Sequence, residues 1–157
     1  MVGNLPYNIS TPVLFHLLKS HELISDMTFM LQLEVVQRIT ARAGEKSYGR
    51  LGLMLQYHCE VEHLFNVPST AFTPAPKVGS AIVRLKPYKK KPIEAKDPKI
   101  LETVIRTAFN QRRKTLRNSL KALLRESKKP SSVDLSLRPE TLSLEDYVEI
   151  SNALTGD

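Results

Sequence analysis

Apolar residues in the first half of the chain recur at two spacings, which predicts strands that alternate with helices. A continuous apolar run or a strict alternation indicates a strand, and apolar residues three or four apart indicate a helix. The predicted strands cover 27–31, 60–67 and 78–85, and the predicted helices begin at Ser10 or cover 34–43 and 48–58. Because the last two strands follow one another directly, they predict a hairpin.

The second half of the chain has only helical spacing. The apolar positions of residues 100–109 form one stripe, and the leucines of residues 116–124 form another on a helix rich in cations. Ser143, followed by Glu145 and Asp146, predicts the capped start of a last helix. Between the halves, the charged, proline-interrupted residues 88–98 predict a solvated basic linker. The chain therefore divides into an α/β part, 1–87, and an all-α part, 99–157.

Composition narrows the class of protein. The chain has 157 residues, of which 41% are hydrophobic, so it can bury a core and is not a disordered segment. It has no run of about 20 apolar residues and no signal peptide at its start, and its single cysteine, Cys59, excludes a disulfide framework. The four histidines are not at metal-ligand spacing. We therefore expect a cytoplasmic protein with no metal site.

The positive charge is concentrated in one segment. The net charge is +7, and residues 110–129 hold eight cations and one acid, Glu126. Such a cluster predicts a polyanionic partner such as RNA, although it is also compatible with a solvated helix face.

The segment Asn4-Leu5-Pro6-Tyr7 is the strongest chemical signal. The exocyclic amine of adenine is a poor nucleophile, because its lone pair is conjugated into the ring. An asparagine oxygen and a backbone carbonyl beside a proline can accept both amine protons and direct the lone pair outward. A following aromatic ring can stack on the base, which contributes about 1–3 kcal/mol. The alternative is a turn between a strand and a helix that uses Asn and Pro only for geometry.

Four segments resemble, in order, the ribosomal RNA adenine dimethyltransferase family, and the bacterial small-subunit enzymes are the nearest group. They are VGNLPYNISTP (residues 2–12), MLQ-EVVQR with YGRL (residues 30–38 and 48–51), FTPAPKVGSA (residues 72–81) and FNQRRKTLRN (residues 109–118). The resemblance continues to Arg138-Pro139-Glu140, so it covers almost the whole chain.

The resemblance implies a substrate, a methyl donor and a set of site residues. The enzyme transfers methyl groups from S-adenosylmethionine to adenines of small-subunit (16S-type) rRNA, and its partner is the immature small ribosomal subunit. The implied catalytic residues are Asn4, Leu5, Pro6, Tyr7 and Phe72, and Asn4 also borders the donor. Phe72 has a second interpretation, as a plug of the core. The implied RNA contacts are Lys77, Arg84, Arg112, Arg113, Lys114, Arg117 and Lys121, of which Lys77 and Arg84 are isolated cations that are also compatible with simple solvation.

The resemblance also implies what this sequence lacks. The family binds the donor with a glycine-rich loop after its first strand, and none of the six glycines forms such a loop here. We therefore expect the C-terminal half of a Rossmann-like methyltransferase sheet followed by a small all-α domain, with Met1 near the start of the fourth strand. Such a fragment would be inactive alone, and the open edge of its sheet would favour self-association.

Two other functions stay open at this point. The first is a non-catalytic RNA-binding or ribosome-assembly module, which is the literal interpretation of a chain without a donor loop. The second is a large-subunit rRNA adenine methyltransferase of the antibiotic-resistance type.

Overall fold

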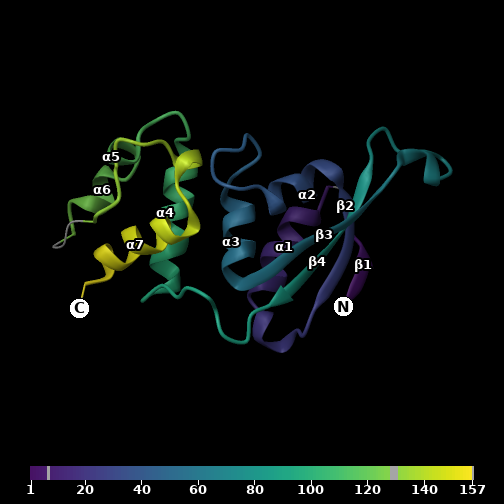
Figure 1. The fold of residues 1–157 in the computed structure, drawn as a ribbon, viewed down its shortest axis with the longest axis horizontal. Helices are drawn as coiled ribbons and strands as arrows, with labels where there is room; N and C mark the ends of the chain where they lie inside the picture. Colours follow the sequence, from purple (N-terminus) through teal and green to yellow (C-terminus); the bar gives the residue numbers. More distant parts are fainter. Residues whose placement is uncertain (7, 128–130, 157) are drawn as a thin grey trace.

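The computed structural model describes residues 1–6, 8–127 and 131–156. Its first part is a four-stranded sheet with helices on one side, and its second part is a group of helices that packs beside α3 (Figure 1). The strands are β1 (Val2–Asn4), β2 (Met27–Gln32), β3 (Cys59–Val67) and β4 (Ser80–Pro87). The helices of the first part are α1 (Ser10–Leu18), α2 (Leu33–Thr40) and α3 (Arg50–His58), and those of the second part are α4 (Pro98–Asn110), α5 (Leu116–Ser119), α6 (Lys121–Leu124) and α7 (Leu144–Thr155). Short 3-10 helices cover His21–Leu23, Ser69–Ala71 and Pro139–Thr141.

The sheet has the order β1-β2-β4-β3, with β1 parallel to β2 and the other pairs antiparallel. The predicted hairpin is confirmed as β3 and β4, and the predicted mixed α/β architecture is present. Register places Asn4 opposite Met30, Met30 opposite Ile82, and Ile82 opposite Phe65. Since directly paired residues face the same side of a sheet, these four residues lie on one face.

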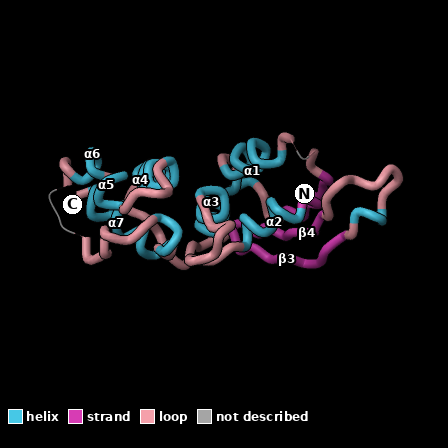
Figure 2. The backbone as a smooth tube through the Cα atoms, turned by 90° about the horizontal axis from the view of Figure 1, so that it is seen from above, coloured by secondary structure: helices cyan, strands magenta, loops and turns pink. Residues whose placement is uncertain are grey.

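Helices α1, α2 and α3 cover the other face of the sheet (Figure 2). Phe29 and Leu31 of β2 and Val83 of β4 point into that layer and are buried. Gly52 allows α3 to approach α2 closely, because a Cβ atom at this position would lie 2.3 Å from the carbonyl oxygen of Arg38. In the described part of the chain, no helix covers the face that carries Asn4.

The helical part is built on α4 and α7. The stripe predicted from the sequence is confirmed, because Leu101, Val104, Ile105 and Ala108 of α4 are fully buried. The predicted cap of α7 is also confirmed as a capping box between Ser143 and Asp146.

One local prediction was wrong. The cation-rich segment is not one helix, because α4 ends at Asn110 and two four-residue helices follow from Leu116. The amides of Leu116 and Arg117 donate to the carbonyls of Leu137 and Leu135, at 2.9 Å each, so a tertiary contact begins the new helix. At the other end of the chain, the predicted start of a helix at Ser10 is confirmed, because Ser10 is the first residue of α1, with Ile9 at the N-cap position.

Hydrogen bonds and aromatic contacts join the two parts. The Tyr48 hydroxyl donates to the carbonyl oxygen of Leu142 at 2.6 Å, and the amide of Gly44 donates to that of Glu140 at 2.7 Å. The ring of Phe109 lies between Tyr48 and Tyr147, with centroid distances of 6.1 and 5.9 Å. Burial raises the pKa of the Tyr48 hydroxyl well above its usual value, so it remains a donor.

The connector between the parts is partly packed. Its amide at Ala95 donates to the Tyr57 hydroxyl at 3.1 Å, and Ala95 is buried. Lys96 is also held, because its amide donates to the side chain of Asn152 at 2.8 Å. The predicted linker is therefore fixed near its C-terminal end rather than solvated throughout. The exact domain boundaries stay a prediction.

Candidate active site

Asn4 is positioned by the parallel pairing of β1 with β2. It is the last residue of β1, and the amide of Leu5 continues the pairing by donating to the carbonyl oxygen of Met30 at 3.3 Å. A tight turn follows, in which the amide of Ile9 donates to the carbonyl oxygen of Pro6 at 3.2 Å. The strand therefore ends with Asn4 exposed at its carboxyl end, where ligands of open α/β sheets bind.

A pocket of about 290 Å³ opens beside Asn4. Its walls come from three segments far apart in the sequence: the end of β1, Met30 of β2, and the loop between β3 and β4. The lining residues are Asn4, Leu5, Pro6, Met30, Phe72, Pro74 and Pro76. We call this the base pocket. It brings together four of the five predicted catalytic residues; the fifth, Tyr7, lies outside the described residues.

The base pocket has two acceptors that the fold does not use. Within the described residues, no donor bonds to the Asn4 side chain or to the carbonyl oxygen of Leu5. The carbonyl of Pro6, in contrast, is occupied by the amide of Ile9. The pattern predicted from the sequence, an asparagine oxygen and a carbonyl beside a proline, is therefore present in the form of Asn4 and Leu5.

Phe72 supplies an aromatic wall. It follows the 3-10 helix Ser69–Ala71, and its amide donates to the carbonyl of Ser69 at 3.3 Å. Its ring is half-buried and lines the base pocket without joining the hydrophobic core. The interpretation of Phe72 as a core plug is therefore wrong, and the ring is available to contact a ligand.

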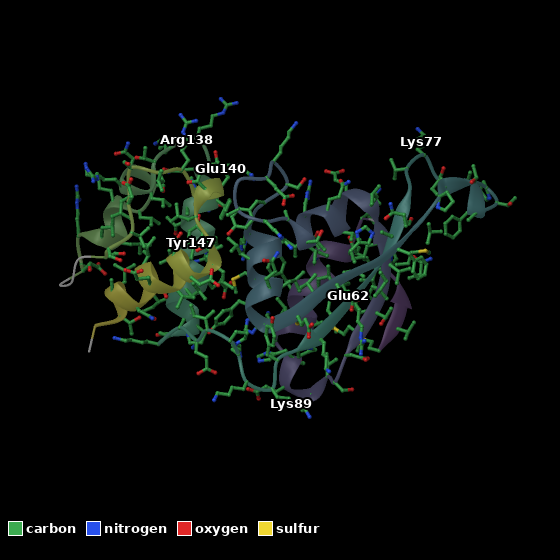
Figure 3. The ribbon with its side chains drawn as sticks, in the orientation of Figure 1. Glu62, Lys77, Lys89, Arg138, Glu140 and Tyr147 are labelled. Carbon is green, nitrogen blue, oxygen red and sulfur yellow. The ribbon has the colours of Figure 1, made fainter. Side chains whose placement is uncertain are left out.

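Two isolated cations lie outside the base pocket. Lys77 is exposed on the loop beyond Phe72, where its side chain points away from the sheet (Figure 3). Arg84 of β4 pairs with Thr28 of β2, and its guanidinium donates to the carboxylate of Asp26 at 3.2 Å. Arg84 thus has a carboxylate partner within the fold, and its role as an RNA contact stays a prediction.

Arg112 differs from the cations that follow it. Its Nη2 atom donates to the carbonyl oxygens of Lys46 at 3.0 Å and Tyr48 at 2.7 Å, so it joins the helical part to the sheet part. Its guanidinium also lies over the ring of Phe109, at 5.6 Å from the centroid. Arg113 and Lys114 lie on exposed turns, and Arg117 and Lys121 are exposed on α5 and α6. Arg112 is itself exposed but has partners within the fold, and the role of all five cations as RNA contacts stays a prediction.

A second pocket contains cations that the sequence analysis did not identify. It has a volume of about 560 Å³ and is lined by Glu34, Arg38, Lys46, Ser47, Gly49, Arg50, Leu51, Gly52 and Arg112. We call this the basic pocket. No local pattern predicts it, because Arg112 is brought to the others only by the packing of the two parts.

Other reactive groups are buried or dispersed. Burial raises the pKa of the Cys59 thiol to about 12, so this side chain is not a thiolate nucleophile. The described residues contain no group of three or more histidine, cysteine or acidic side chains that could hold a metal ion. None of the described helices is both long and apolar enough to cross a bilayer.

Comparison with protein families gives one match over nearly the whole chain. The model of the family "Ribosomal RNA adenine dimethylase" matches residues 1–155. Among curated proteins, the Ribosomal RNA small subunit methyltransferase A of Pseudomonas aeruginosa is 59% identical over 155 residues, and that of Pseudomonas savastanoi is 60% identical over 156 residues. These alignments cover 98% and 99% of this chain, and 58% of each relative. The chain therefore spans less than two thirds of the length of the relatives it matches.

Two solved structures have the same fold. A dimethyladenosine transferase from Plasmodium falciparum matches with a TM-score of 0.78 and 25% identity, over 95% of this chain and 64% of that one. The 23S rRNA methyltransferase ErmE matches with a TM-score of 0.66 and 23% identity, over 99% of this chain and 64% of that one. At that identity, the likeness to ErmE concerns the fold alone.

Proposed function

Because the chain belongs to the ribosomal RNA adenine dimethylase family, we propose that it supplies the base-holding and RNA-docking parts of an enzyme that dimethylates adenine amines in small-subunit rRNA. The observation that carries this proposal is the base pocket. It combines two unused acceptors, Asn4 and Leu5, with the aromatic ring of Phe72. These are the groups needed to orient an exocyclic amine and to stack on a base taken out of its helix.

The chain's own residues act on the nucleophile. The side-chain oxygen of Asn4 and the carbonyl oxygen of Leu5 accept the two amine protons, which turns the nitrogen lone pair toward the donor. Phe72 contacts the base face, and Pro6, Pro74 and Pro76 narrow the pocket around it. Stiff walls limit the orientations open to the base, and precise orientation is a large part of a rate enhancement in group transfer.

S-adenosylmethionine supplies the methyl group as a sulfonium electrophile. The residues of this chain could form only the edge of the S-adenosylmethionine site. Asn4 is exposed at the carboxyl end of β1, where the donor would lie beside it, but the sequence has no glycine-rich loop. We therefore expect residues 1–157 alone to bind RNA without transferring methyl groups. A calorimetric titration with S-adenosylmethionine tests this expectation, and saturable one-to-one binding would contradict it.

The choice of small-subunit RNA is supported by the relatives. Those at 59% and 60% identity carry small-subunit names, whereas the 23S enzyme ErmE shares the fold at 23% identity. We propose the immature small ribosomal subunit in the cytoplasm as the setting. Stronger binding to naked large-subunit RNA than to small-subunit particles would favour the antibiotic-resistance alternative.

The base pocket is tested with an RNA hairpin whose loop carries one adenine next to one 2-aminopurine, a fluorescent base that reports the loss of stacking on its neighbour. We expect binding to raise its fluorescence, because the adenine leaves the stack and enters the base pocket. Asn4→Ala and Phe72→Ala should remove this change while leaving RNA affinity nearly intact. A hairpin with 2-aminopurine in its stem is the control. Tight binding with no fluorescence change in the loop would refute the base site and favour a non-catalytic RNA-binding module.

The open edge of β1 supports a second proposal, that copies of this chain associate through the sheet. Val2 is 84% exposed and Met1 is 56% exposed, and β1 pairs with β2 alone among the described strands. Sedimentation at increasing concentration should show a dimer. A monomer with an intact sheet would count against it.

A further inference from the structure

The basic pocket combines cations from four segments of the chain around a hollow that the proposed catalytic chemistry does not use. Arg38 comes from α2, Arg50 begins α3, Lys46 lies on the loop between these helices, and Arg112 reaches in from the helical part. Glu34 is the only carboxylate among its lining residues. Four cations and one acid give this small hollow a net charge of +3, which favours an anion.

Two of these cations form ion pairs within the fold that an incoming anion can replace. Arg38 forms an exposed ion pair with Glu34 at 2.8 Å, and Arg50 forms a longer one with Glu102 at 3.5 Å. Exposed pairs of this kind contribute little to stability, so an anion can compete with them. Arg50 also has an Nε atom that is buried without a hydrogen-bond partner in the described part of the chain. Its guanidinium also lies over the ring of Phe15, at 5.0 Å from the centroid, so the fold holds this cation in place.

The walls of the basic pocket are fixed by backbone contacts. Gly52 brings the backbone of α3 directly against that of α2 beneath Arg38, where a Cβ atom would clash. Arg112 holds the loop at Lys46 and Tyr48 through their carbonyl oxygens. The first turn of α3, from Arg50 to Gly52, also lines the hollow, and the amides of a first turn favour negative charge. A rigid, positively charged hollow with free N–H donors suits a phosphate group.

We infer that the basic pocket binds a backbone phosphate of the RNA next to the base held at Asn4, and this inference rests on the proposed function. Strand β2 links the two pockets. Its Met30 lines the base pocket, and the chain continues from Gln32 directly into α2, which carries Arg38. On its other side, the basic pocket is followed by the exposed Arg113 and Lys114. An RNA strand that runs from the base pocket toward the helical part would pass over the basic pocket.

The test measures how RNA affinity depends on salt. A fluorescently labelled single-stranded RNA is titrated with the full chain by anisotropy at KCl concentrations from about 50 to 200 mM, a range over which phosphate contacts dominate affinity. The variant is Arg38→Gln with Lys46→Gln, which removes two pocket cations and leaves Arg50 and Arg112 in place. The matched control is Lys89→Gln with Lys90→Gln, which removes the same charge from the exposed connector (Figure 3).

We expect the pocket variant to lower the slope of log K against log[salt] by about 0.7, since the basic pocket binds one phosphate and each phosphate contact with single-stranded nucleic acid contributes about 0.7. The control should change the slope much less. The charge-keeping pair Arg38→Lys with Lys46→Arg should restore most of the binding, and circular dichroism should show each variant folded. Equal slopes for the pocket variant and the control would overturn the inference while leaving the proposed function standing. No RNA binding by the unchanged chain would refute both.

Discussion

Adjacent arginines at 112 and 113 have different roles, and substitution can separate them. Arg112 donates to two backbone carbonyls across the contact between the sheet part and the helical part, at 3.0 and 2.7 Å. Arg113 is exposed and has no hydrogen bond or ion pair with any described residue. We therefore predict that Arg112→Ala destabilises the chain, whereas Arg113→Ala weakens RNA binding without destabilising it.

The size of the effect follows from the contacts. A hydrogen bond from a charged donor contributes about 1.5–3 kcal/mol, but water competes for an exposed guanidinium. For the two bonds together we take about 2 kcal/mol, below their simple sum. In a chain of this length, 1 kcal/mol corresponds to about 2–4 °C in Tm, so Arg112→Ala should lower Tm by about 4–8 °C. Arg113→Ala should change the free energy of unfolding by less than about 0.5 kcal/mol, as is usual for a surface substitution.

Thermal and urea unfolding, followed by circular dichroism, measure both variants. Arg112→Lys is a useful third variant, because it keeps the charge but lacks the planar guanidinium that lies over the ring of Phe109. We expect it to remain destabilised. If Arg112→Ala and Arg113→Ala have the same Tm as the parent chain, the two hydrogen bonds do not stabilise the contact, and the reasoning fails.

Three further predictions concern stability. Gly52→Ala should lower the urea midpoint, because its Cβ would lie 2.3 Å from the carbonyl oxygen of Arg38, and Gly79→Ala is the control. Helix propensity alone would stabilise Gly52→Ala by about 1 kcal/mol, so a higher urea midpoint would exclude the clash. Ser143→Ala should cost about 1 kcal/mol by removing the capping box of α7, and an unchanged urea midpoint would show that the cap contributes nothing. Burial lowers the pKa of His58 to about 4, so the unfolded chain binds its proton first and the free energy of unfolding should fall as pH drops from about 6.5 to about 4. His58→Gln should reduce this loss, and identical pH profiles for parent and variant would refute it.

Local patterns predicted the elements whose environment is set by their own sequence. The alternation of 60–67 and 78–85 identified the β3–β4 hairpin. One face of β4 is buried against the helices, whereas β3 is mostly exposed and only its Cys59 is buried. Ser143 and Asp146 identified the start of α7, since the capping box depends on residues only three apart. Asn4 and Phe72 were predicted as site residues, and the loop between the hairpin strands does bring them together.

Long-range contacts decided what the sequence analysis missed. The break after α4 arises because Leu116 and Arg117 pair with a segment about 20 residues away, and helical spacing contains no sign of that pairing. The linker is partly packed because Tyr57, on α3, reaches Ala95. The basic pocket needs Arg112 beside the loop that carries Lys46, a proximity that depends on the tertiary fold.

The contact between the two parts of the chain has a consequence for how the sequence can vary. Arg112 and Tyr48 donate to main-chain oxygens, and the amide of Gly44 meets the main-chain oxygen of Glu140. Every residue has such an oxygen, so the identities of Lys46, Glu140 and other acceptor residues can drift without loss of these bonds. Of these donors, only Arg112 and Tyr48 depend on their side chains. Apart from Lys46, whose charge belongs to the basic pocket, the residues of the loop at 42–47 can therefore vary while the contact between the two parts is kept.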